Sequence, residues 1–108
     1  MDLGIKGKWA ILAGSSRGLG RACAESIARE GVNVVINGRN QADVDVAVAE
    51  LTSRYGTKSV GVVGDSAMSS VQDELMAACP TPDILLLNGQ GPSPKSFLDI
   101  EIDDWNAA

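Results

Sequence analysis

The sequence predicts an α/β fold in which parallel strands alternate with helices to form a doubly wound sheet. Three observations support this prediction. Apolar runs of strand length recur along the chain, segments with apolar residues every three or four positions lie between them, and a glycine-rich turn joins the first run to the first such segment. Runs that are apolar throughout are typical of parallel strands covered by helices on both faces. The 108 residues are enough for one domain.

The first strand is predicted over residues 8–13, and the glycine-rich turn AGSSRGLG follows at residues 13–20. In the helix beyond it, Leu19, Cys23 and Ile27 recur every four residues and are expected to form the buried face. The first turn of a helix leaves backbone N–H groups unpaired and carries the positive end of the helix dipole, so a phosphate fits there. Glycine allows a sharp turn, close approach of a phosphate and close packing of helix on strand.

The glycine spacing separates kinds of phosphate site. A Walker loop needs Lys and then Ser or Thr after its last glycine, whereas Gly18 is followed by Leu-Gly-Arg. The usual dinucleotide fingerprint starting at Gly18 would need a small residue at Cys23. A methyltransferase-like nucleoside site is disfavoured because three glycines exceed what an adenosine group needs. A tight loop without ligand would be the alternative for the turn alone, but the flanking strand and helix favour nucleotide binding.

The pattern Gly-x-x-x-Gly-x-Gly formed by Gly14, Gly18 and Gly20 resembles that of the short-chain dehydrogenase/reductase family, and the resemblance extends from residue 1 to residue 108. The family usually has Thr before the first glycine, where this chain has Ala13. The resemblance implies a Rossmann-like sheet with strand order 3-2-1-4. It also implies hydride transfer between a nicotinamide coenzyme and a small carbonyl or alcohol substrate. Among the members of the family, an acyl-carrier 3-oxoacyl reductase is the first candidate. The cofactor-binding residues expected in the turn are Gly14, Ser16, Arg17, Gly18, Leu19 and Gly20.

The end of the second strand, predicted over residues 32–37 after a helix stop at Gly31, bears on the choice of coenzyme. An NAD site generally has Asp or Glu about twenty residues beyond the glycine motif. Here that region contains Arg39 and no acidic residue, and Arg17 in the glycine-rich turn can reach the same space. Because a guanidinium binds phosphate through two hydrogen bonds, NADP(H) is favoured over NAD(H). The alternative is that Arg39 is a solvated charge at a strand end.

The next helix is expected to run from an N-cap at Asn40 to a stop at Gly56. Tyr55 lies on its apolar face and has no lysine four residues later, so we expect a core residue and not the family's catalytic tyrosine. Ser69 or Ser70 is expected to cap a third helix that carries Val71, Leu75 and Met76 and ends before residues 80–82.

Polar residues follow the third and fourth strands, predicted over residues 59–63 and 84–87. The resemblance implies that Asp65 accepts a hydrogen bond from the adenine amino group beside the Ser66 backbone, although Asp65 also fits an ordinary turn. Residues 87–90 resemble the family's Asn-Asn-Ala-Gly element, with only Asn88 identical. By analogy Asn88 bonds across to the first strand, and the backbone of Gly89 and Gln90 lies beside the ribose. Residues 97–105 resemble the lead into a further helix that begins near residue 105.

The family's catalytic tyrosine, lysine, serine and asparagine have no matching positions in residues 1–108, so no catalytic residue is assigned. Residues 1–108 are therefore expected to be the N-terminal part of a single NAD(P)-binding Rossmann domain, and this part alone is expected to be inactive. The whole protein is expected to form a homo-oligomer. The alternative is a non-catalytic nucleotide-binding module that associates through an exposed strand edge.

Composition excludes several classes of function. The net charge of −5 without a basic stripe disfavours nucleic acid and anionic membranes as partners. No apolar stretch reaches membrane-spanning length, and no leader pattern is present, so a cytoplasmic protein is expected. Histidine is absent, which removes histidine catalysis. Cys23 and Cys79 lack metal-site spacing and are expected to be reduced thiols.

Overall fold

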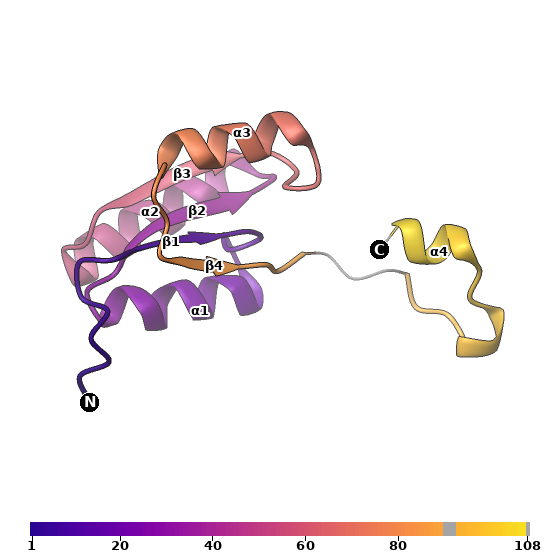
Figure 1. Ribbon diagram of the computed structural model, residues 1–108, viewed down its shortest axis with the longest axis horizontal. Helices are drawn as coiled ribbons and strands as arrows, with labels where there is room; N and C mark the ends of the chain where they lie inside the picture. Colours follow the sequence, from indigo (N-terminus) through magenta and orange to yellow (C-terminus); the bar gives the residue numbers. More distant parts are fainter. Residues whose placement is uncertain (90–92, 108) are drawn as a thin grey trace.

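The computed structural model describes residues 1–89 and 93–107. Its centre is a sheet of four parallel strands in the order β3-β2-β1-β4 (Figure 1). The strands are β1 (Trp9–Leu12), β2 (Asn33–Gly38), β3 (Ser59–Val63) and β4 (Ile84–Leu86). In the register, Ile11 of β1 lies opposite Val35 of β2 and Leu85 of β4. The predicted strand order is confirmed.

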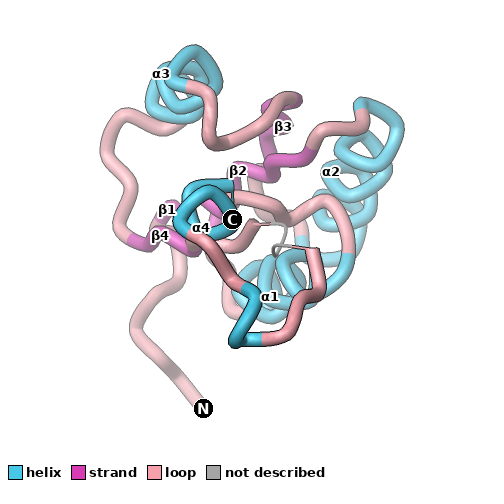
Figure 2. The backbone as a smooth tube through the Cα atoms, turned by 90° about the vertical axis from the view of Figure 1, so that its right-hand side faces the viewer, coloured by secondary structure: helices cyan, strands magenta, loops and turns pink. Residues whose placement is uncertain are grey.

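Helices cover both faces of this sheet, as a doubly wound fold requires (Figures 1 and 2). The helices α1 (Gly18–Arg29) and α2 (Gln41–Tyr55) pack on one face, and α3 (Ser69–Ala78) packs on the other. Alternate strand residues serve the two faces, as the side-chain period of a strand dictates. Leu12 and Ile36 belong to the cluster under α1 and α2, whereas Ile11 and Val35 belong to the cluster under α3.

The predicted buried face of α1 is partly wrong. The side chain of Leu19 is 79% exposed, and the buried residues are Gly20, Ala24 and Ala28. Cys23 is only partly buried, at the margin of the same core cluster. Small residues along one helix face allow the backbone to approach the sheet closely, so α1 turns this face inward and leaves Leu19 outside.

The predicted ends of α2 are confirmed. The Asn40 side chain accepts a hydrogen bond from the Asp43 N–H at 3.0 Å, and Gly56 follows the helix in the left-handed conformation with φ +66°. Its N–H donates to the carbonyl of Thr52. Asn40 and Gly56 thus satisfy groups that a bare helix end leaves unpaired.

The predicted cap of α3 is wrong, because the cap position is occupied by Met68 and Ser69 is already helical. The turn before α3 is organised instead by Asp65, whose side chain accepts a hydrogen bond from the Ala67 N–H at 2.9 Å. Met76, predicted on the apolar face, is 49% exposed.

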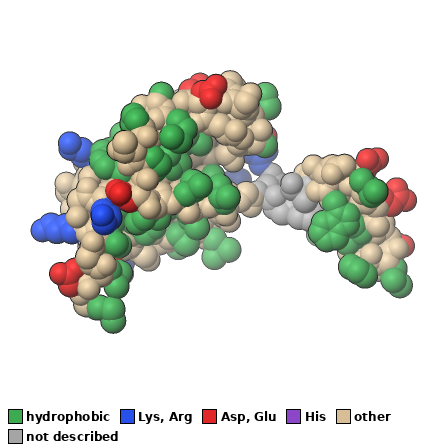
Figure 3. All heavy atoms as spheres, in the orientation of Figure 1, with side chains coloured by type: hydrophobic (Ala, Val, Ile, Leu, Met, Phe, Trp, Pro, Cys, Tyr) green, Lys and Arg blue, Asp and Glu red, His purple; other side chains and the backbone are tan. Residues whose placement is uncertain are grey.

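The C-terminal segment contains a short 3₁₀ helix, η1 (Phe97–Asp99), and the helix α4 (Ile102–Ala107). The helix therefore begins three residues before the predicted position. The side chains of Phe97, Leu98 and Trp105 are exposed here, and Figure 3 shows hydrophobic side chains on the surface of this segment. In the part of the chain that the structure describes, no helix is long and apolar enough to cross a membrane.

Candidate coenzyme site at the carboxyl ends of the strands

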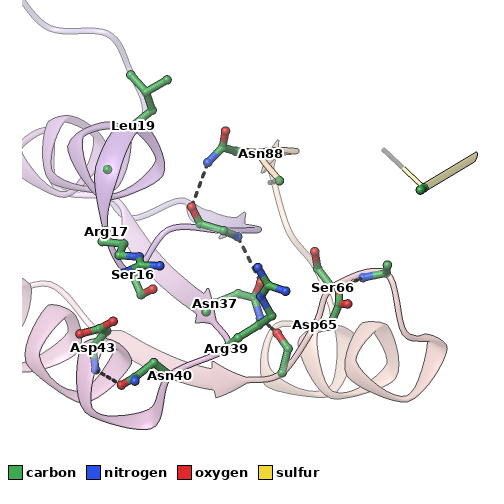
Figure 4. Close-up of a pocket in the computed structure, with 17 residues that line it drawn as sticks. Ser16, Arg17, Leu19, Asn37, Arg39, Asn40, Asp43, Asp65, Ser66 and Asn88 are labelled. Atoms are coloured by element: carbon green, nitrogen blue, oxygen red, sulfur yellow. Dashed lines mark hydrogen bonds between the residues drawn. The ribbon is translucent and has the colours of Figure 1, made fainter. Parts of the chain in front are cut away.

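A cleft of about 820 Å³ opens at the carboxyl ends of the four strands. Residues from the loops after β1, β2, β3 and β4 all line it (Figure 4). This edge is where open α/β sheets bind ligands, because loops from several strands converge there. The volume falls within the range of small-molecule and cofactor sites.

Ten of the twelve residues predicted to bind cofactor line this one cleft. They are Gly14, Ser16, Arg17, Gly18, Leu19, Arg39, Asp65, Ser66, Asn88 and Gly89. Gly20 does not line it and is buried at the start of α1. Gln90 lies outside the described residues.

Close backbone contacts require glycine at Gly14, in the turn between β1 and α1, and at Gly20, in the first turn of α1. Gly14 has φ +61°, and a Cβ atom there would overlap the backbone carbonyl of Asn88. A Cβ atom on Gly20 would overlap the backbone carbonyl of Gly14. The first glycine lets β1 and the segment after β4 approach each other, and the second lets the helix start close to its own turn.

The N-terminus of α1 faces the cleft without a cap from the described residues. Arg17 holds the cap position in extended conformation, no side chain accepts a hydrogen bond there, and the first turn has no acidic residue. The N-terminus of α2, by contrast, is capped by Asn40. The backbone N–H groups of the first turn of α1 therefore have a local positive field with no carboxylate from that turn to offset it.

Two arginines approach the cleft from different loops. Arg17 lies in the glycine-rich turn, and Arg39 is the residue directly after β2 (Figure 4). Both side chains are exposed. Asp43 and Asp65 line the same cleft. The cleft thus combines positive and negative groups, which suits a ligand with both anionic and hydrogen-bond donor parts.

Asn88 ties the fourth strand to the glycine turn. Its side-chain Nδ2 donates to the backbone carbonyl of Gly14 at 2.9 Å (Figure 4). This bond joins the ends of β4 and β1, in keeping with the bond across to the first strand that the resemblance implied.

Seven of the lining residues were not predicted from the sequence: Asn37, Gly38, Asn40, Asp43, Gly64, Ala67 and Ala107. Asn37 is the most informative of these, because its side chain is buried and bonds to the segments after both β1 and β3. The signal was a polar residue at the end of an otherwise apolar strand, since buried amides require hydrogen-bond partners.

Tyr55, which the sequence placed in the core, does not line the cleft. It is partly buried at the C-terminal end of α2, and its hydroxyl donates to Glu25 Oε1 at 2.8 Å. The Tyr55 hydroxyl therefore links α2 to α1 through a hydrogen bond.

A twisted parallel sheet with a glycine-rich turn and a helix N-terminus at its ligand-binding edge defines a dinucleotide-binding class of protein. The family model described as "short chain dehydrogenase" matches residues 8–108. The chain belongs to the short-chain dehydrogenase family.

Relatives and solved structures agree with this assignment. The chain is 35% identical over 106 residues to the uncharacterized oxidoreductase YvaG of Bacillus subtilis, covering 97% of this chain and 40% of the relative. It is 30% identical to the 3-oxoacyl-[acyl-carrier-protein] reductase FabG of Aquifex aeolicus, covering 97% of this chain and 44% of the relative. The structure of L-sorbose reductase from Gluconobacter frateurii, complexed with NADPH and L-sorbose, matches with a TM-score of 0.84 and 30% identity, covering 97% of this chain and 41% of that chain. The chain thus spans less than half the length of these relatives.

Proposed function

We propose that the protein is an NADP(H)-dependent oxidoreductase that transfers a hydride between the nicotinamide and a small carbonyl or alcohol substrate. The observation that carries this proposal is the uncapped N-terminus of α1 at a cleft lined from all four strand ends. Bound coenzyme supplies the hydride chemistry, and the residues of this chain supply binding and orientation.

The pyrophosphate is proposed to bind at the turn between β1 and α1. Gly18 and Leu19 begin α1, so their N–H groups have no partners in the preceding helical turn. Ser16 lines the same part of the cleft and can contribute a hydroxyl. Gly20 supports this site indirectly, because its lack of a side chain lets α1 start close to Gly14.

The choice of NADP(H) rests on Arg17 and Arg39. Both are exposed and line the cleft, and a guanidinium is well suited to a 2′-phosphate. The NADPH complex of L-sorbose reductase, a protein of similar fold and 30% identity, supports the same preference.

The remaining contacts of the coenzyme are assigned from their place in the cleft. Asp65 and Ser66 are proposed for the adenine, and Asn88, Gly89 and Gln90 for the ribose side of the nicotinamide. Asp65 uses Oδ1 for the Ala67 N–H, so its interaction with adenine would fall to Oδ2.

The whole protein is proposed to contain its catalytic groups outside residues 1–108, which we assign to the N-terminal part of one Rossmann domain. This chain alone is then expected to bind coenzyme without turnover. The FabG relative supports a 3-oxoacyl substrate as the first to assay. The free cysteines Cys23 and Cys79 support a reducing compartment such as the cytoplasm.

A second candidate is a non-catalytic nucleotide-binding module that self-associates. Among the described residues β4 pairs only with β1, and Leu85 and Leu87 are 60% and 79% exposed. An apolar edge strand of this kind promotes association. This candidate predicts a homo-oligomer that the substitution Leu85→Lys dissociates in analytical ultracentrifugation, and coenzyme binding without oxidoreductase activity in the whole protein.

The test of the main proposal is a calorimetric titration with NADPH and NADH. NADPH is expected to bind more tightly, and Arg39→Asp is expected to weaken NADPH binding by roughly tenfold to a hundredfold, the value of one or two charge-assisted hydrogen bonds. Arg29→Asp, the same charge change outside the cleft, should leave both affinities nearly unchanged. Equal affinities for the two coenzymes, or no effect of Arg39→Asp, would contradict the assignment of the 2′-phosphate site.

A further inference from the structure

The side chain of Asn37, the penultimate residue of β2, links the end of β2 to the turn after β1 and to the end of β3. It is 2% exposed. Its Oδ1 accepts from the Gly14 N–H at 3.1 Å, and its Nδ2 donates to the carbonyls of Val62 and Gly64, each at 3.1 Å. Both Nδ2 protons and one oxygen lone pair are therefore engaged, with partners after β1 and at the end of β3. Figure 4 shows the position of Asn37 in the cleft.

The main chain of Asn37 holds the same turn through Ser15. The Ser15 N–H donates to the carbonyl of Asn37 at 2.7 Å, and the Asn37 N–H donates to Ser15 Oγ at 3.0 Å. Ser15 is fully buried, and its hydroxyl also donates to the Leu12 carbonyl at 2.7 Å. These bonds are shielded from water, so breaking one leaves a buried polar group unpaired.

We propose that Asn37 is a positioning residue for the coenzyme site. It fixes the glycine turn, and with it Arg17, relative to Arg39 two residues further along and to Asp65, which follows Gly64. It acts through the Gly14 backbone and the end of β3. This inference rests on the proposed function, because it concerns the spacing of groups assigned to the coenzyme.

The test compares Asn37→Ala with Asn33→Ala. Asn33 is a matched control at the opposite end of β2, where its side chain accepts from the Lys58 N–H at 3.0 Å and donates to the Gly7 carbonyl at 3.4 Å. NADP⁺ affinity is measured by calorimetry well below the unfolding temperature of each variant, and hydrogen exchange is measured at the Gly14 amide. Both variants should unfold at lower temperature. Only Asn37→Ala should weaken NADP⁺ binding, by about tenfold, and accelerate exchange at Gly14.

Asn37→Asp provides a rescue experiment. A protonated carboxyl has the shape of the amide and can donate to one of the two carbonyls, of Val62 or of Gly64, while its other oxygen accepts from the Gly14 N–H. A carboxylate facing the same two carbonyls cannot donate at all. Burial and these carbonyls should raise the pKa of the introduced carboxyl. The NADP⁺ affinity of Asn37→Asp is expressed relative to the unsubstituted protein at each pH, so that the effects of the shared groups Arg17, Arg39, Asp43 and Asp65 cancel. This relative affinity should recover in part as the pH is lowered from about 8 to about 5.

The outcomes separate the two proposals. If the unsubstituted protein binds NADP⁺ and Asn37→Ala binds it equally well, the positioning role is wrong and the proposed function stands. If both asparagine variants weaken binding equally, the role of Asn37 is only structural and the inference fails. If the unsubstituted protein binds neither NADP⁺ nor NAD⁺, the proposed function is overturned and this inference falls with it.

Discussion

Gly14 and Gly18 share a left-handed backbone, with φ +61° and +64°, but differ in their surroundings. A Cβ atom on Gly14 would overlap the Asn88 carbonyl, whereas one on Gly18 meets no atom within 4 Å. We expect Gly18→Ala to cost about 1 kcal/mol in the free energy of unfolding, from backbone strain alone. Gly14→Ala should lower the free energy of unfolding clearly more, because the backbone at Asn88, after β4, must also move. Urea unfolding of both variants measures this difference, and equal costs would contradict the described turn.

Asn40 offers a second test at single-residue scale. Its side chain caps α2, so Asn40→Ala should lower the free energy of unfolding by about 1 kcal/mol. Ser69→Ala is the matched control, because Ser69 makes no capping bond in the structure. If thermal unfolding shows that Ser69→Ala is as destabilising as Asn40→Ala, the assignment of Met68 to the cap position of α3 is wrong.

Single residues were predictable from the sequence where their role is local. The cap at Asn40 and the stop at Gly56 depend only on the adjacent turn of helix, and both are confirmed. Leu19 and Asn37 depend on packing between distant segments. The exposure of Leu19 follows from the small residues that bring α1 close to the sheet, and the bonds of Asn37 follow from the register of three strands.

The contact between α1 and α2 predicts a pH dependence of stability. The hydrogen bond from the Tyr55 hydroxyl lowers the pKa of Glu25, and the nearby guanidinium groups, led by Arg54, lower it further. A carboxyl with a lowered pKa in the folded state stabilises the fold above its ordinary pKa, and that contribution is lost as pH falls through the lowered value.

Glu25→Gln should therefore reduce the melting temperature at neutral pH, and the difference from the unsubstituted protein should shrink as the pH is lowered. Thermal unfolding between about pH 7 and about pH 3 measures this. Glu74→Gln, an exposed change on α3, should show a smaller difference at neutral pH. A difference for Glu25→Gln that grows toward acid pH would refute the lowered pKa.

The elements themselves were largely predictable, because each strand is an apolar run bounded by turn residues. The predicted span of β3 agrees with the structure, and the order β3-β2-β1-β4 followed from the family resemblance. The start of α3 was not predictable from serine alone, because Asp65 organises the preceding turn through the Ala67 N–H. The start of α4 was placed late because Glu101, the residue before it, is not among the common N-cap residues. The helix start is marked instead by the Asp104 side chain, which accepts a hydrogen bond from the Glu101 N–H at 2.9 Å.

At the scale of the whole molecule, the sheet brings four loops to one edge. Residues far apart in the sequence, such as Gly14 and Asn88, meet there through a hydrogen bond of 2.9 Å. The sequence indicated which residues would gather at this edge, because the carboxyl ends of parallel strands lie together. It did not indicate that Gly20 stays out of the cleft and acts through helix packing.

The central claim is that the N–H groups at the start of α1 bind the pyrophosphate of a dinucleotide. A crystal structure of the protein grown with NADP⁺ tests it most directly. We predict the pyrophosphate at the backbone of Gly18 and Leu19, with the 2′-phosphate between Arg17 and Arg39. Coenzyme bound away from the turn between β1 and α1, or a pyrophosphate without contact to these amides, would contradict the claim.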